Sequence, residues 1–135
     1  MSYEEISHTA DVKIRARAKT LESLFSDAFD ALMHVVYGKN RSGKQQMIIE
    51  VHASDPESLL ADFLSEVLFV SEVEGRVFAH ADITIEGTDL SAVLFWEPFD
   101  PARHAEGTEV KGISYSGLSI REDTNGYILD ILFDV

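Results

Sequence analysis

Cysteine is absent from this chain of 135 residues. Its absence excludes disulfide bonds, thiol catalysis and structural zinc sites with cysteine ligands. No apolar run approaches the roughly 18 residues that a membrane-spanning helix needs, and the first residues lack the pattern of a secretory signal peptide. With a length typical of one domain, these absences predict a single globular domain over residues 1–135, a cytoplasmic location and no membrane partner.

Basic residues are scarce. The chain has 11 Lys and Arg against 24 Asp and Glu, a formal net charge of -13. The imbalance lies in one part of the sequence, because residues 1–44 have a net charge of +1 and residues 45–135 a net charge of -14. Nucleic-acid affinity comes mainly from the neutralisation of phosphates by cations. The composition therefore predicts no tight independent binding of nucleic acid, and it fits a partner with a basic surface, or a cation.

Familiar catalytic motifs are also missing. The sequence contains no G-x-G-x-x-G, no phosphate-binding loop, no G-x-S-x-G and no H-E-x-x-H. Three histidines, at positions 34, 52 and 80, fall on the rims or solvent faces of predicted elements. His104 lies in an irregular loop bracketed by Pro98 and Pro101, where it is a candidate for function. No complete hydrolase or zinc-protease pattern emerges.

The hydrophobic pattern predicts two helices and six strands. Thr20 caps a helix that Gly38 ends, and Asp55 with Pro56 begins a second helix that ends at Gly75. Alternating segments predict strands over 11–19, 47–52, 77–85, 90–96, 110–120 and 127–134, the last two joined by Asn125-Gly126. Four successive strands after the second helix favour an α+β fold, in which two amphipathic helices pack on a mostly antiparallel β-sheet.

The first long strand has a cationic face made by Lys13, Arg15, Arg17 and Lys19. Four cations on one face could bind phosphate or an acidic partner. The same row is also typical of an edge strand protected by charge, or of cross-strand pairing with acidic neighbours. We favour this structural interpretation.

Hard oxygen ligands occur at both ends of the sequence. Asp134 and the terminal carboxylate of Val135 follow an alternating strand, and Asp11 begins the first long strand. Divalent cations such as Ca²⁺, Mg²⁺ and Mn²⁺ favour such oxygens. Near Asp11, His8 could be a ligand, a base oriented by the aspartate, or a turn residue with local hydrogen bonds.

Together, three segments resemble the archease family. Residues 7–12 (Ser-His-Thr-Ala-Asp-Val) are similar to its opening H-T-A-D motif, residues 109–115 to its V-K-x-x-[TS]-Y strand, and residues 131–135 to its terminal F-D-[VI]. Two positions differ from the family: Lys13 replaces a residue that is small in many relatives, and Ser116 follows Tyr115 where a His is usual. A role of that His would not transfer to this chain.

Archeases are non-catalytic cofactors of the RtcB-type RNA ligase that joins tRNA exons. The resemblance implies that this protein promotes GTP-dependent guanylylation of the ligase and multiple turnover. It also implies a divalent metal ion (Ca²⁺, or Mn²⁺ or Mg²⁺) bound by Asp11, Asp134 and Val135. We assign action on the ligase to Lys111, at the family's V-K position, together with His8.

Two other functions stay open at this stage. One is a metal-dependent enzyme acting on nucleotides or RNA, with His8 as base and Asp11 and Asp134 holding the ion. The other is a general chaperone or adaptor for RNA-modifying enzymes, which would use the acidic surface. We expect no enzymatic activity of its own.

Overall fold

The computed structural model of the protein describes residues 3–6 and 11–135. The elements in this part of the chain follow in the order β1 (Tyr3–Ile6), β2 (Asp11–Ala18), α1 (Leu21–Tyr37), β3 (Gln45–His52), α2 (Pro56–Glu74), β4 (Arg76–Glu86), β5 (Asp89–Pro98), α3 (Pro101–His104), β6 (Gly112–Asp123) and β7 (Gly126–Asp134).

Both long helices begin and end where the sequence predicts. The side chain of Thr20 accepts a hydrogen bond from the Ser23 N–H at the start of α1, and Gly38 follows its last turn with φ 82°. Asp55 caps α2 in the same way, and Gly75 ends that helix in the left-handed conformation. These caps satisfy backbone groups that a helix leaves unpaired at its termini.

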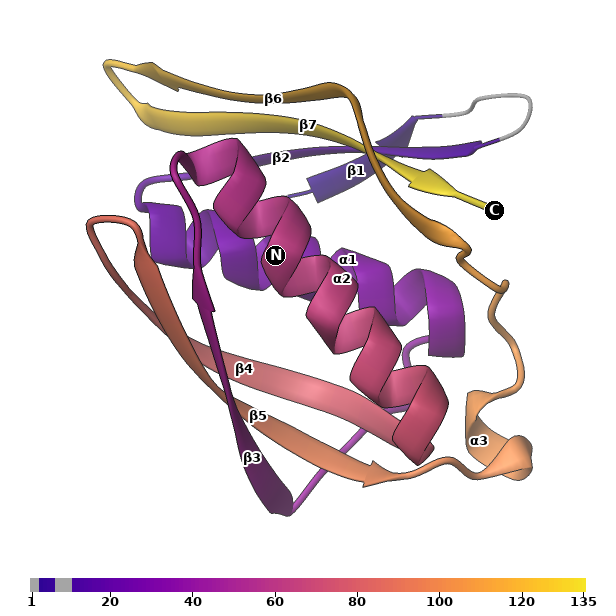
Figure 1. The fold of residues 1–135 in the computed structure, drawn as a ribbon. Coiled ribbons are helices and arrows are strands. Elements are labelled where there is room, and N and C mark those ends of the chain that lie inside the picture. The colour runs from indigo at the N-terminus through magenta and orange to yellow at the C-terminus, as the bar shows by residue number, and fades with distance from the viewer. Residues whose placement is uncertain (1–2, 7–10) are drawn as a thin grey trace.

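The strands form two antiparallel sheets. One has four strands in the order β1-β2-β7-β6, and the other has three in the order β3-β5-β4. Figure 1 shows the four-stranded sheet above, the three-stranded sheet below, and α1 and α2 between them. Each sheet therefore has one face against the helices and one face toward solvent.

The core fills the space between the sheets and the helices. Phe29 of α1 stacks on Phe63 of α2 with ring centroids 6.3 Å apart, and its centroid lies 6.4 Å from that of Phe78 in β4. Phe133 of β7 closes the core from the opposite sheet and is fully buried. Burial of these large rings is the main contribution to the stability of such a fold.

The predicted α+β class, the two amphipathic helices and the antiparallel pairing are confirmed. The hairpin at Asn125-Gly126 also occurs as predicted. The sequence prediction missed β1 and the short helix α3, which lies inside the expected irregular loop. In the described part of the chain, every helix is too short or too polar to cross a membrane.

Candidate functional site

Asp11 and Asp134 lie directly opposite each other at one end of the four-stranded sheet. The antiparallel register of β2 and β7 pairs these two residues, and it pairs Ala18 with Tyr127 at the other end. Directly opposed residues have Cα atoms about 4.5–5.5 Å apart and side chains on the same face. Because neighbouring Phe133 points into the core, Asp134 points away from it. The sheet thus brings together two carboxylates from distant parts of the sequence.

Asp130, on the same face of the sheet, is a carboxylate that does have cationic partners. Asp130 accepts a hydrogen bond of 2.7 Å from the Arg15 Nε, and its other oxygen lies 3.3 Å from the Arg121 Nη2. Within the described residues, neither Asp11 nor Asp134 forms an ion pair of this kind. Two opposed like charges without a counter-charge are unfavourable. This end of the sheet therefore suits a bound cation.

Within the paired strands β2 and β7, Lys13 is the basic residue that the register places nearest to this pair. It is opposite Leu132, which makes it a diagonal neighbour of Asp134 at about 7–8 Å. No ion pair links its ammonium group to either aspartate within the described part of the chain. Lys13 therefore adds a positive charge beside the two carboxylates without occupying the space between them.

Lys111 lies next to the paired aspartates. Its backbone N–H donates a hydrogen bond of 2.7 Å to the carbonyl oxygen of Asp134, and the following residue, Gly112, pairs with Asp134 across β6 and β7. The Lys111 side chain is exposed, and its ammonium group forms no ion pair with a described residue. Among the described residues, the charge of Lys111 is therefore not neutralised by an ion pair.

Val135 follows the strand at the same end of the sheet (Figure 1). Its carboxylate is the third oxygen ligand that the sequence predicts, beside Asp11 and Asp134. Within residues 3–6 and 11–135, no group of three or more His, Cys, Asp and Glu side chains is spaced to hold a metal. The predicted set has only two such side chains, so it depends on the terminal carboxylate. His8, the other predicted residue, lies outside the described residues.

The segment before Lys111 is fixed against the end of α1. The Thr108 N–H donates a hydrogen bond of 2.8 Å to the Val35 carbonyl oxygen. At Gly107 the backbones approach so closely that a Cβ atom would lie 1.9 Å from the Val36 carbonyl oxygen. Val110 is buried. These contacts position Lys111 relative to the core, and the sequence shows no pattern that would predict them.

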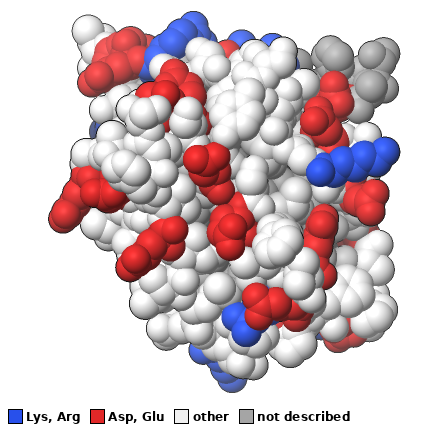
Figure 2. All heavy atoms as spheres, in the orientation of Figure 1, with Lys and Arg blue, Asp and Glu red and all other residues white. Residues whose placement is uncertain are grey.

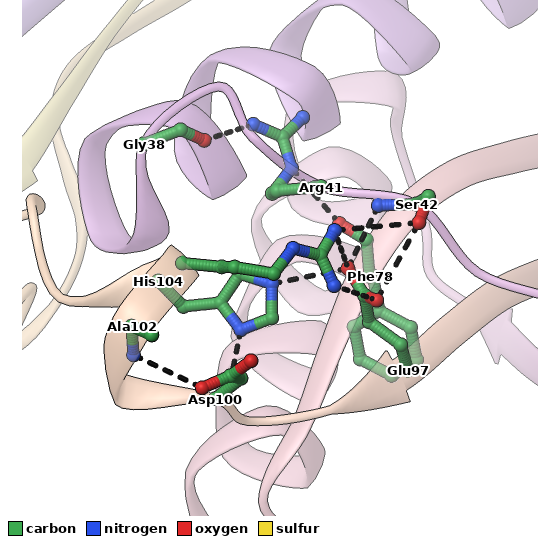
Figure 3. A network of polar contacts seen from close by, with 9 residues as sticks. Gly38, Arg41, Ser42, Phe78, Glu97, Asp100, Ala102 and His104 are labelled. Atoms are coloured by element: carbon green, nitrogen blue, oxygen red, sulfur yellow. Dashed lines mark hydrogen bonds and ion pairs between the residues drawn. The ribbon is translucent and has the colours of Figure 1, made fainter.

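A partly buried polar network holds the start of this segment (Figure 3). Glu97 at the end of β5 accepts hydrogen bonds from Arg103 (2.6 Å), from the Ser42 N–H (2.8 Å) and from His104 (3.0 Å). Burial by itself raises the pKa of Glu97, but these hydrogen bonds outweigh burial and lower the pKa to about 2. Glu97 is thus a carboxylate that two other segments, the loop at Ser42 and the helix α3, hold in the ionised state.

His104 has a structural environment. Its side chain is fully buried, and its Nδ1 accepts a hydrogen bond of 2.9 Å from the Asp100 N–H. Because Nδ1 accepts a hydrogen bond, the ring proton lies on Nε2, and this N–H donates a hydrogen bond to the Glu97 carboxylate. The functional role considered for this loop histidine thus has little support, since no part of the ring faces solvent. The expected exposure of His34, His52 and His80 is confirmed.

The structure also separates the two interpretations of the cationic row. Cross-strand pairing occurs at Arg15, which contacts Asp130. The edge-strand interpretation is wrong, because β2 lies between β1 and β7. Arg17 is exposed and forms no ion pair within the described part of the chain. The row is thus only partly neutralised.

Comparison with known proteins decides the family. The model of the Archease protein family (MTH1598/TM1083) matches residues 3–135. The chain belongs to the archease family. It is 36% identical over 129 residues to the archease of Pyrococcus abyssi, covering 92% of this chain and 91% of that protein. The archease of Methanopyrus kandleri is 31% identical over 140 residues, with full coverage of both chains.

Solved structures show the same fold. Protein 1598 of Methanobacterium thermoautotrophicum superimposes with a TM-score of 0.81 at 20% identity, covering 99% of both chains. An archease of Thermotoga maritima, described as a possible chaperone, superimposes with a TM-score of 0.68 at 18% identity, covering 98% of this chain and 96% of that one. The arrangement of sheets and helices is therefore the archease fold.

Proposed function

We propose that this protein is a non-catalytic cofactor that activates the GTP-dependent RtcB-type RNA ligase of tRNA splicing in the cytoplasm. In this role it promotes guanylylation of the ligase and multiple turnover. Membership of the archease family over residues 3–135 supports the proposal. The observation that carries it is the convergence of Asp11, Lys111 and Asp134, which come from three motifs, at one end of one sheet.

Lys111 is the residue that we propose acts on the ligase. An exposed ammonium group that has no ion-pair partner among the described residues keeps its full charge available to a carboxylate or phosphate of another molecule. Its backbone hydrogen bond to Asp134 fixes the base of the side chain while leaving the charged end free. We retain His8 as a second activation residue on the basis of the sequence motif.

We infer that Asp11, Asp134 and the terminal carboxylate of Val135 hold a divalent cation, either Ca²⁺ or Mn²⁺ or Mg²⁺. The opposed aspartates fit such an ion because they are hard oxygen donors that lack a paired cationic side chain among the described residues. When bound, the ion would offset two of the three negative charges and cross-link the ends of β2 and β7. Lys111 would then project from a rigid strand end.

Ligase guanylylation tests the proposal directly. Purified RtcB-type ligase is incubated with labelled GTP, with and without substoichiometric amounts of this protein, and transfer of the label to the ligase is followed over time. We expect faster labelling and several rounds of RNA joining per ligase molecule. Equal labelling with and without the protein would contradict the proposed function.

One structurally similar protein suggests a second function, since the Thermotoga maritima archease is described as a possible chaperone. A general chaperone or adaptor would recover several RNA-modifying enzymes in pull-downs without the ligase. A metal-dependent enzyme would instead turn over nucleotides, phosphoesters or RNA in the presence of Mn²⁺ and the absence of ligase. Either result would support the corresponding function in place of the proposed cofactor role.

Weak RNA binding by the isolated protein is part of the proposal. The net charge of -14 over residues 45–135 repels phosphate groups, so RNA would be contacted by the ligase and not by this protein. Tight, salt-sensitive binding of RNA to the isolated protein would count against this role.

A further inference from the structure

The free edge of β3 lies beside a groove that does not include the paired aspartates, which belong to the other sheet. β3 is one of the two outer strands of the three-stranded sheet, and it pairs on one side only, with β5. A groove of about 450 Å³ runs along it, lined by residues 47–52 of the strand and by Asp62, Glu66 and Val70 of α2. The unpaired backbone groups of an edge strand are a template for another strand.

β3 lacks the features that usually block such pairing. Its eight residues, Gln45–His52, contain no Pro and no Lys, and their pairing with β5 runs without a register shift. The outer strands β4 and β6 are both interrupted, by register shifts at residues 78–80 and 114–119 respectively. β1 has four described residues, two of them glutamates. Among the described edges, β3 is therefore the longest regular one.

The side chains around this edge specify the chemistry of an added strand. Toward α2, the groove presents the carboxylates of Asp62 and Glu66, of which Asp62 also accepts a hydrogen bond of 2.7 Å from the Tyr115 hydroxyl. No Lys or Arg lines the groove. On the solvent face of β3, Ile48 is 62% exposed beside exposed Glu50. An added strand would alternate between these two environments. Cationic residues on the face of the added strand toward α2 would match the carboxylates there. Apolar residues on its other face would match exposed Ile48.

We propose that the β3–α2 groove binds an extended, basic segment of a partner protein, which adds to β3 as a fourth strand of that sheet. Main-chain hydrogen bonds to the β3 edge would supply affinity, and the acidic side chains would select the basic sequence. Figure 2 shows Asp and Glu side chains over the middle of the face that α2 crosses in Figure 1, whereas Lys and Arg lie toward its margins.

Charge complementarity favours a basic protein segment over two other occupants of the β3–α2 groove. A second copy of this chain, which has a net charge of -13, would bring the same acidic groove against itself. A nucleic acid would bring phosphates against Asp62 and Glu66. The inference does not depend on the ligase proposal, because it concerns a different surface and is tested without the ligase.

Three capped peptides of eight residues, matched in length to β3, test the proposal on the unmodified protein. One alternates lysine and valine, one alternates glutamate and valine, and one is the lysine peptide with every second backbone amide N-methylated. Binding is followed by NMR on isotope-labelled protein. We expect the lysine peptide alone to shift the amide resonances of residues 47–52 and to slow hydrogen exchange at alternate β3 amides. Higher salt should weaken this binding.

A charge-reversal variant provides the second test. The double substitution Glu50→Lys and Glu66→Lys should weaken binding of the lysine peptide about tenfold or more, whereas Glu122→Lys on β6 should leave it unchanged. Equal binding by the N-methylated peptide, unchanged binding by the double variant, or no binding at millimolar peptide would overturn the proposal. So would a single-stranded RNA oligonucleotide that shifts the same β3 resonances.

Discussion

The backbone N–H of Lys111 donates a hydrogen bond of 2.7 Å to the carbonyl oxygen of Asp134. This bond joins the residue proposed to act on the ligase to a residue proposed to bind metal. It also extends the pairing of β6 with β7 by one residue, since Gly112 is opposite Asp134. The two proposed activities therefore share one rigid strand end and can be separated by substituting side chains only.

The metal proposal predicts stabilisation by divalent ions. Ca²⁺ or Mn²⁺ should raise the thermal midpoint of the untagged protein, because an ion that binds only the folded state stabilises it by mass action. Asp11→Asn or Asp134→Asn should abolish the increase, and a tag after Val135 should weaken it by removing the free carboxylate. Differential scanning calorimetry measures this effect, with Glu122→Gln as the control. An unchanged midpoint in wild-type protein would show that the site is misassigned.

Lys13 should oppose the binding of that ion. Its ammonium group is a diagonal neighbour of Asp134, so it repels a cation bound between the two aspartates. We expect Lys13→Ala to lower the dissociation constant for Ca²⁺ roughly threefold at low ionic strength. Isothermal titration measures the constant. Arg17→Ala is the matched control, because Arg17 lies on the same strand face four residues beyond Lys13, opposite Ile128 and farther from the two aspartates. Equal effects of the two substitutions would rule out a local repulsion.

Lys111→Ala should separate activation from folding. The side chain is exposed and unpaired within the described residues, so the thermal midpoint should stay nearly unchanged. Stimulation of ligase guanylylation should be mostly lost. Lys19→Ala, at the opposite end of the same sheet, should keep full stimulation. Wild-type stimulation by the Lys111 variant would refute the assignment of this residue.

The Glu97 network predicts that the stability of the fold depends on pH in the acidic range. The pKa of Glu97 is about 2 in the folded protein and ordinarily 4.5, so its stabilisation is fully present above pH 4.5. It is lost as the pH falls from 4.5 through 2. Glu97→Gln should lower the free energy of unfolding at pH 7 by about 2 to 3 kcal/mol and flatten the pH dependence in that range.

Urea unfolding at a series of pH values measures this dependence. Glu50→Gln replaces an exposed glutamate for which no ion pair is found among the described residues, so its pH profile should follow that of the wild type. If Glu97→Gln also follows the wild-type profile, the network does not hold the carboxylate in its ionised form.

Gly107 should not tolerate a side chain. A Cβ atom there would lie 1.9 Å from the Val36 carbonyl oxygen, so Gly107→Ala must displace the segment that leads to Lys111. We expect a loss of about 2 to 3 kcal/mol in the free energy of unfolding. Gly112→Ala is the matched control, because a Cβ atom there meets nothing within 4 Å. Similar losses in both variants would show that the close approach is not the cause.

The sequence by itself determined the elements that local chemistry defines. Thr20 and Asp55 begin helices because their side chains accept backbone hydrogen bonds a few residues ahead. Asn125-Gly126 turns a hairpin because glycine adopts positive φ, 130° at Gly126. Asp11 and Asp134 could also be recognised as candidate metal ligands from the sequence, because a carboxylate is a hard oxygen donor wherever the fold places it.

Only the tertiary structure decided which of these residues meet. The register of β2 against β7 sets Asp11 opposite Asp134, and the strand order makes β3 an edge and β2 an interior strand. Glu97, Ser42 and His104 are likewise joined across three segments without any sequence pattern. Pairing between distant segments depends on how whole faces pack, so a single strand's pattern cannot reveal its neighbour.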